Sequence, residues 1–331
     1  MRCISSKCKA VCFMILLCSV ILLSAGCGKE EEQIDYAQNY ESVQFNSSLY
    51  KGQLFASDLC VVDGDVVLAG FTGDSSLHAA GLFDIKDETV LYSDKVFDEL
   101  YPASTTKLMT ALLVLKYGNL EDEVIVSEKA TDFAWDEQVC GLETGDHISM
   151  NDLLNGLLLY SGNDTAVAIA EHISGSVDAF VQLMNEEAKR IGATKTNFVN
   201  PHGLHQEKHK TTAYDLYLIF NECCKDQRFL DIISQTSYVG TITDADGEVR
   251  TAQWDATHYY ASGKAEEPEG VYVIGGKTGT TDEAGSCVIL LERDEAGDSY
   301  ISIIMGASDK TILYDNMTQM LDKGIVGATT N

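Results

Sequence analysis

The sequence predicts an α/β (α+β) fold in which an antiparallel sheet is flanked by helices and faced by a mostly helical insertion. Strand-like patterns occur near residues 77–93 and again over 271–305, whereas helical patterns occupy the region between them. The chain has 331 residues, of which 45% are hydrophobic, so it can bury a sizeable core. We therefore expect one sheet built from both ends of the chain.

Residues 1–27 have the features of a secretory signal. An apolar run over 10–23 is preceded by three basic residues, Arg2, Lys7 and Lys9. Small residues follow the run and lead to Cys27. The stretch before Cys27 resembles a bacterial lipoprotein processing site, which predicts lipidation of that cysteine. Ordinary signal cleavage and an uncleaved anchor remain alternatives, although the apolar run is short for crossing a bilayer.

The chain is strongly acidic, with a formal net charge of -28 that becomes -31 when the three basic residues of the signal are removed. Such a surface argues against nucleic acid as a partner and against electrostatic attraction to anionic lipid. Membrane attachment would then depend on lipid at Cys27, and at least two acyl chains are expected. Residues 28–55 are polar and acidic without an apolar period, so we interpret them as a tether.

The first predicted elements are a hairpin and a buried helix. Strands over 77–85 and 89–93 flank a turn at 86–88. After Pro102 and Ser104 the sequence is apolar nearly all round, which is typical of a helix buried through its middle. Because Pro102 suits a helix start, we expect Ser104 at the positive end of this helix.

The middle and the end of the chain complete the prediction. Helical character runs over 151–159, breaks at 161–163 and resumes over 165–173, with Asp164 expected to cap the second helix. The later elements are antiparallel strands over 271–274, 287–292 and 300–305, followed by a closing helix over 311–323. We assign residues 56–325 to one domain and 326–331 to a short tail.

The remaining cysteines and histidines do not form a recognisable metal site. Five cysteines lie beyond Cys27 and show no CxxC spacing, which leaves disulfide pairing open: Cys60, Cys140, Cys223, Cys224 and Cys287. The adjacent pair Cys223 and Cys224 is interpreted as buried small residues. A second cluster contains His202, His205, Glu207 and His209. Pro201 and Gly203 oppose a regular helix there and no HExxH is present, so we expect no metal.

Three short motifs carry the chemistry: Ser104-x-x-Lys107, Ser161-Gly162-Asn163 and Lys277-Thr278-Gly279. Their order matches the signature of penicillin-interacting serine enzymes. Ser104 needs a base to remove its proton, and Lys107, on the same helical face, can act only when neutral. Lowering a lysine pKa from about 10.4 to about 7 costs roughly 4 kcal/mol, which burial and the charge of Lys277 would supply.

The other motif residues have expected roles around this pair. Ser161 can relay a proton to the leaving group, and Asn163 can hold both Lys107 and a substrate carbonyl. Lys277 and Thr278 would bind a carboxylate, and Gly279 leaves a strand edge open to an extended peptide. The backbone amides of Ser104 and Thr280 are the candidates for an oxyanion hole.

The motifs and their flanks resemble the D-alanyl-D-alanine carboxypeptidases, the low-molecular-mass penicillin-binding proteins. The resemblance covers about residues 75–325 and is carried by YPASTTK at 101–107, LYSGND at 159–164, NFVNPHGL at 197–204 and GKTGTT at 276–281. It implies a β-lactamase/transpeptidase-like fold and removal of the terminal D-alanine from peptidoglycan stem pentapeptides through an acyl-enzyme on Ser104. It further implies acylation of this serine by β-lactams, a location outside the cytoplasm facing the cell wall, and no cofactor.

Two departures from the family are expected to matter. We expect the C-terminal β-rich domain and amphipathic membrane helix of many relatives to be absent, with an N-terminal lipid replacing that anchor. Relatives often place an arginine near the last helix to help bind the substrate carboxylate, but no arginine follows Arg293. Lys310 is the expected substitute.

Other functions remain as alternatives. A class A β-lactamase shares the three motifs but needs a glutamate in an ExxLN-like segment after the second one, and residues 196–204 contain no acid. We therefore expect a slowly hydrolysed penicilloyl adduct. A surface lipoprotein that binds peptidoglycan peptides or senses β-lactams without cutting is a further alternative. A Ser-His-Asp hydrolase is disfavoured because no GxSxG elbow occurs.

Overall fold

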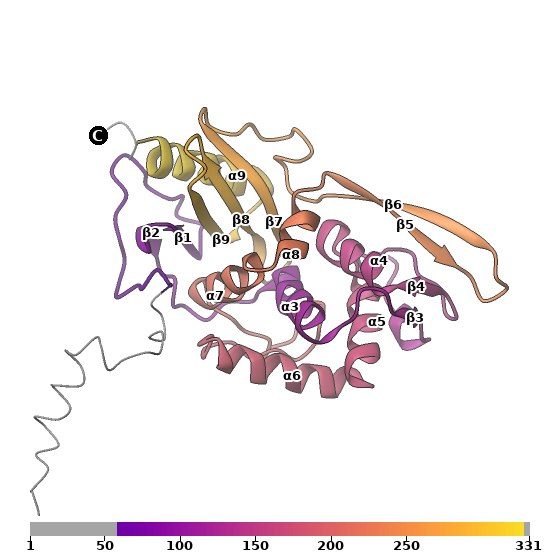
Figure 1. Cartoon of the computed structure of the whole chain (residues 1–331). Helices are drawn as coiled ribbons and strands as arrows, with labels where there is room; N and C mark the ends of the chain where they lie inside the picture. Colours follow the sequence, from indigo (N-terminus) through magenta and orange to yellow (C-terminus); the bar gives the residue numbers. More distant parts are fainter. Residues whose placement is uncertain (1–57, 328–331) are drawn as a thin grey trace, which may run out of the picture. The chain divides into compact units, whose positions relative to one another are not determined.

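The computed structural model describes residues 58–327, and its central feature is a five-stranded antiparallel sheet in the order β2-β1-β9-β8-β7. The strands are β1 (Ala79–Asp84), β2 (Thr89–Asp94), β7 (Val271–Thr281), β8 (Gly285–Asp294) and β9 (Ser299–Ala307). The first two strands therefore pair with the last three, as the sequence predicted (Figure 1). The predicted signal, Cys27 and the 28–55 tether lie outside the described residues.

Both faces of this sheet are covered by helices. Helices α7 (Ala213–Cys224) and α8 (Gln227–Ile233) contact one face, and α9 (Lys310–Leu321) contacts the other. Alternate residues of β8 accordingly pack into different cores: Ile289 and Leu291 on the α7 side, Val288 and Leu290 on the α9 side. Burial on both faces explains why β1, β8 and β9 are buried and largely apolar along most of their length rather than alternating. The closing helix extends through a π-helical turn over Asp322–Val326, so it includes the first residue assigned to the tail.

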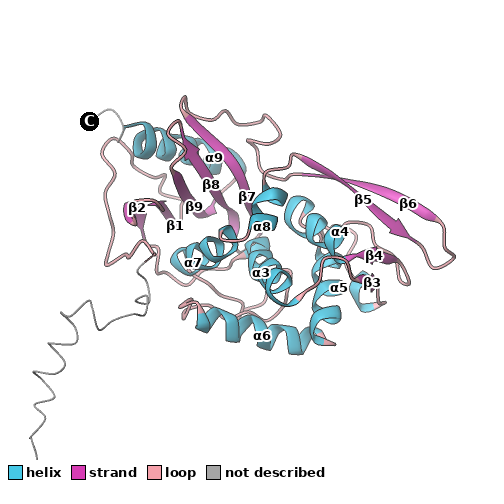
Figure 2. Ribbon diagram, in the orientation of Figure 1, coloured by secondary structure: helices cyan, strands magenta, loops and turns pink. Residues whose placement is uncertain are grey.

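The insertion between the two halves of the sheet is mostly helical, as expected (Figure 2). It contains α3 (Lys107–Tyr117), α4 (Met150–Asn155), α5 (Asn163–Ser174) and α6 (Val177–Arg190). Helix α3 is buried from Lys107 to Leu115, which confirms the prediction of a helix buried through its middle. It packs against α5, α6 and α7 and so joins the insertion to the sheet.

The sequence prediction missed a second sheet. Four antiparallel strands, in the order β3-β4-β5-β6, comprise β3 (Glu123–Ile125), β4 (His147–Ser149), β5 (Ser237–Thr243) and β6 (Val249–Asp255). Figure 1 shows β5 and β6 as a long hairpin that extends away from the helices. Strands β3 and β4 have only three residues each, and the hairpin of β5 and β6 is largely exposed. None of the four strands therefore has a strong apolar pattern. Buried Trp254 attaches the hairpin to the helical region.

Within residues 58–327 no helix is long and apolar enough to cross a bilayer. The five cysteines of this part of the chain are all free thiols. Cys223 is buried, as interpreted from the sequence, whereas its neighbour Cys224 is partly exposed.

Candidate active site

The three motifs meet where the insertion packs against the last strand of the five-stranded sheet. Ser104 lies in a 3₁₀ turn, Ala103–Thr106, that runs directly into α3, so Lys107 begins that helix. The Ser161–Asn163 motif links a π-helical turn over Gly156–Tyr160 to α5. Lys277 is in β7, which packs against the 3₁₀ turn.

Lys107 is fully buried and makes three hydrogen bonds. Its Nζ lies 3.0 Å from Ser104 Oγ, 2.7 Å from Asn163 Oδ1 and 2.7 Å from the backbone oxygen of His202. Burial, and then the positive charge of Lys277, lowers the pKa of Lys107 well below 10.5. These are the two causes expected from the sequence, and they favour the neutral amine that a base requires.

Ser161 contacts the second buried lysine. Lys277 Nζ donates to Ser161 Oγ at 2.8 Å and to the backbone oxygen of Thr278 at 3.0 Å. Burial lowers the pKa of Lys277 to about 7. Ser161 itself has φ of 70°, a left-handed conformation that is uncommon for a residue with a Cβ and is typical of constrained functional positions.

The third motif brings a strand edge to the nucleophile. A Cβ on Gly279 would lie 2.9 Å from the backbone nitrogen of Ser104, so only glycine lets the strand approach this closely. Thr278 Oγ1 lies 2.6 Å from Thr257 Oγ1, and the exposed Thr280 is paired with Ser286 of β8. Because β7 is the last strand of its sheet, its other edge has no strand neighbour within residues 58–327.

One contact of Lys107 was missed from the sequence, namely its hydrogen bond to the backbone oxygen of His202. The loop that carries it is fixed from both sides: Asn200 Oδ1 accepts from the amides of His202 and Gly203, and Thr110 Oγ1 donates to the Pro201 oxygen at 2.6 Å. Gly203 has φ of 96°. The Asn-Pro-His-Gly run is a turn signal that could have indicated this loop, but a backbone contact leaves no trace in side-chain chemistry.

The histidines considered as metal ligands have other partners. His209 Nε2 lies 2.7 Å from Thr106 Oγ1, and its Nδ1 accepts from the Val199 amide at 3.1 Å. His205 packs edge-on against the ring of Tyr101. In the described part of the chain, no three residues of the types His, Cys, Asp and Glu are grouped so as to hold a metal ion.

The expected cap at Asp164 is wrong. Helix α5 begins at Asn163, Gly162 is its N-cap, and no side chain caps it. Asp164 is instead buried and accepts hydrogen bonds from the amides of Cys140 and Leu142, 24 and 22 residues earlier in the chain. Long-range partners for this carboxylate could not be read from local sequence.

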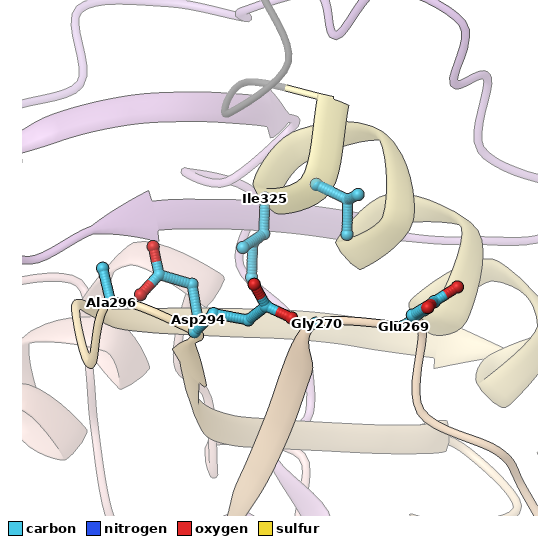
Figure 3. Close-up of a pocket in the computed structure, with 7 residues that line it drawn as sticks. Glu269, Gly270, Asp294, Ala296 and Ile325 are labelled. Atoms are coloured by element: carbon cyan, nitrogen blue, oxygen red, sulfur yellow. The ribbon is translucent and has the colours of Figure 1, made fainter.

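Two further features lie away from the motifs. Lys310 begins α9, and its Nζ lies 5.9 Å from the ring centroid of Tyr259 in a hollow that includes no motif residue. A cavity of about 440 Å³ near the end of β8 is lined by acidic and apolar groups, among them Glu269, Asp294 and Ile325 (Figure 3). It also includes no motif residue.

The antiparallel sheet, the helical insertion and the three motifs at their junction define the class of penicillin-interacting serine enzymes. A family model described as D-alanyl-D-alanine carboxypeptidase matches residues 73–309. The chain therefore belongs to the D-alanyl-D-alanine carboxypeptidase family.

Individual relatives agree with this assignment. The chain is 33% identical over 243 residues to D-alanyl-D-alanine carboxypeptidase DacF of Bacillus subtilis, covering 70% of this chain and 58% of that protein. It is 31% identical to DacA of Haemophilus influenzae, covering 68% and 56%. It thus spans less than two thirds of the length of these two relatives.

Solved structures share the fold. The crystal structure of the Streptomyces K15 DD-transpeptidase superposes with a TM-score of 0.71 at 25% identity, covering 77% of this chain and 99% of that one. Penicillin binding protein 5 from Haemophilus influenzae gives a TM-score of 0.67 at 28% identity, covering 78% and 73%. The β-lactamase/transpeptidase-like fold expected from the motifs is confirmed.

Proposed function

We propose that this protein is a serine-type D-Ala-D-Ala carboxypeptidase that removes the terminal D-alanine from peptidoglycan stem pentapeptides through an acyl-enzyme on Ser104. The observation that carries the proposal is the 3.0 Å contact between Ser104 Oγ and the Nζ of a lysine that burial and a second lysine hold toward its neutral form. β-Lactams would acylate the same serine.

The contacts of Lys107 give the proton transfer its direction. A neutral amine has two N–H groups and one lone pair, and two fixed acceptors are present, Asn163 Oδ1 and the His202 oxygen. When these take both N–H groups, the lone pair faces Ser104 Oγ. Lys107 then accepts the hydroxyl proton while the oxygen attacks the carbonyl carbon of the penultimate D-alanine.

The remaining motif residues would complete the cycle. The backbone amides of Ser104 and Thr280 would stabilise the oxyanion of the tetrahedral intermediate. As the C–N bond breaks, Ser161 would pass a proton to the departing amine of D-alanine and take up in exchange the proton that Lys107 accepted, which returns Lys107 to its neutral form. Water then attacks the ester with Lys107 again as base, which releases the shortened peptide and regenerates Ser104.

Substrate binding would use the free edge of β7. An extended peptide can add beside Gly279 as an extra strand, because that edge has no strand neighbour in the described structure. Its terminal carboxylate would be bound by Lys277 and Thr278, and Asn163 would also contact a substrate carbonyl. A contribution of Lys310 to the carboxylate remains a prediction, and its contacts with Tyr259 do not by themselves support it.

The β-lactamase alternative is not favoured. The family model that matches is that of the carboxypeptidases. Asp164, the acid that follows the second motif, is hydrogen-bonded to backbone amides, which leaves it poorly suited to activate a deacylating water. A slowly hydrolysed penicilloyl adduct remains the expectation.

The location of the enzyme is part of the proposal. The signal-like residues 1–27 support export across the membrane, and the small residues before Cys27 support lipidation there. The protein would be anchored by this lipid with its catalytic domain facing the cell wall. Mass spectrometry of the native N-terminus tests this: an unmodified or uncleaved terminus would overturn the lipid anchor.

The activity is tested with the full chain in detergent and a diacyl-Lys-D-Ala-D-Ala peptide. We expect D-alanine release by the wild type and none by Ser104→Ala. Fluorescent penicillin should label the wild type only. Equal release by both proteins would refute the role of Ser104, and penicillin labelling without D-alanine release would indicate a β-lactam sensor instead.

A further inference from the structure

We propose that Asp164 is a positioning residue for this reaction, because it binds the segment 138–142 to the Ser161–Asn163 motif and thereby holds that motif against the two lysines. We call 138–142 the strap. The inference rests on the proposed function for the reaction it serves, and on the following contacts for the role of Asp164.

The strap and the motif are joined by hydrogen bonds in both directions. Asp164 Oδ1 accepts from the amides of Cys140 and Thr165, both at 2.8 Å, and Oδ2 accepts from the Leu142 amide at 3.1 Å. In return, the Asn163 amide donates to the Gln138 oxygen at 2.8 Å. Asp164 is only 1% exposed, so water cannot replace these partners easily.

The side chain of Cys140 packs against the backbone next to the motif. A Cβ on Gly156 or Gly162 would lie 2.8 Å or 2.6 Å from Cys140 Sγ. Glycines on both sides of the left-handed Ser161 therefore allow the strap to pack directly on the backbone that carries Ser161. This packing leaves the backbone of the motif little room to move at Gly156 and Gly162.

The strap is itself fixed by the second sheet. Trp254 Nε1 of β6 donates to the Cys140 oxygen at 3.3 Å. Arg250 of the same strand donates to the Gly141 oxygen at 3.2 Å and pairs with Asp146. The hairpin that the sequence prediction missed thus supports Asn163, whose Oδ1 is one of the two fixed acceptors for Lys107.

Asp164 also affects Lys107 through its charge. The titratable or charged groups that face Lys107 from the surrounding elements are Lys277, Cys140, Asp164, His202 and His209. Of these, the carboxylate of Asp164 favours the protonated lysine, and so opposes the lowering of the Lys107 pKa by burial and by Lys277. Removing this charge should therefore lower the pKa of Lys107 further.

The test compares Asp164→Asn with a matched control, Asp215→Asn. Asp215 is also a buried aspartate, 4% exposed, and accepts from the Lys195 amide and the Thr196 hydroxyl, but it lies on α7 and is not among the groups that face Lys107. Both changes replace an acceptor oxygen by an amide donor that faces an N–H or O–H group. Both should reduce the melting temperature.

The readout is the rate of penicillin acylation as a function of pH. For Asp164→Asn we expect a loss of about 10- to 100-fold, together with an acid limb that moves to lower pH by about half a pH unit, because the base titrates lower. Asp215→Asn should retain the wild-type acylation rate and the wild-type position of the acid limb. Asp164→Glu, which keeps the charge, should leave the acid limb at its wild-type position while the rate remains reduced.

The outcomes decide the proposal. A folded Asp164→Asn protein that is acylated by penicillin at the wild-type rate overturns the proposal. An acid limb at its wild-type position, together with a loss of acylation rate equal to that of Asp215→Asn, also overturns it. If Asp164→Asn does not fold, Trp254→Phe carries the test: it removes the hydrogen bond to the strap, and wild-type acylation by this folded variant overturns the proposal. D-alanine release by the wild type tests the proposed function separately, since these comparisons use penicillin alone.

Discussion

Glu292 provides a prediction whose size can be worked from the structure. It lies on β8 and is completely buried, with one carboxyl oxygen hydrogen-bonded to the Ser302 hydroxyl. The other oxygen, Oε2, has no hydrogen-bond partner among residues 58–327. This burial raises the pKa of Glu292 from 4.5 to about 8. The folded protein therefore retains a proton that the unfolded chain releases at much lower pH.

The direction of the stability change follows from this difference. Between pH 4.5 and pH 8 the folded state binds more protons at this position than the unfolded state, so the free energy of unfolding falls as the pH rises. The stabilisation is fully present below pH 4.5 and is lost once the pH exceeds 8. At 1.36 kcal/mol per pH unit, the total loss is about 5 kcal/mol.

Glu292→Gln removes the titration while it keeps the size and polarity of the side chain. Urea unfolding of wild type and variant at pH values of about 5, 7 and 9 measures the effect. We expect the free energy of unfolding of the variant, relative to that of the wild type, to increase by several kcal/mol as the pH rises. A stability difference that stays constant over this range would refute the reasoning.

Three further predictions concern the catalytic centre and the surface. Lys107→Arg should reduce penicillin acylation by about a thousandfold or more, because a guanidinium stays protonated and cannot act as the base; wild-type labelling would contradict this. Gly203→Ala should cost about 2–4 kcal/mol in thermal unfolding and slow acylation, since its Cβ would lie 1.9 Å from the Ala103 oxygen. Gly247→Ala, also left-handed but with open space around it, is the control, and an equal loss would exclude the clash as the cause. Trp135 is 96% exposed and Trp254 is 1% exposed, so Trp135→Phe should abolish most acrylamide-quenchable tryptophan fluorescence; undiminished quenching would contradict the structure.

The sequence by itself determined the elements that depend on local pattern and the candidates for the catalytic residues. Apolar stretches separated by turn residues identified the hairpin of β1 and β2 and the meander of β7 to β9, and a sequence that is apolar nearly all round identified the buried helix α3. The motifs identified Ser104, Lys107 and Lys277, since nucleophile and base are side-chain types at a fixed spacing. The Lys107 pKa is lowered by burial and by the charge of Lys277, the two causes expected from the sequence.

Only the tertiary structure decided the features that depend on long-range contacts. The second sheet went unpredicted because its short or exposed strands have weak patterns. The His202 oxygen is a backbone group, and Asp164 finds partners more than 20 residues away, so neither role could be read from neighbouring residues. The sequence named the candidate reacting groups, but the acceptors that contact Lys107 come from distant segments, whose approach only the packed fold determines.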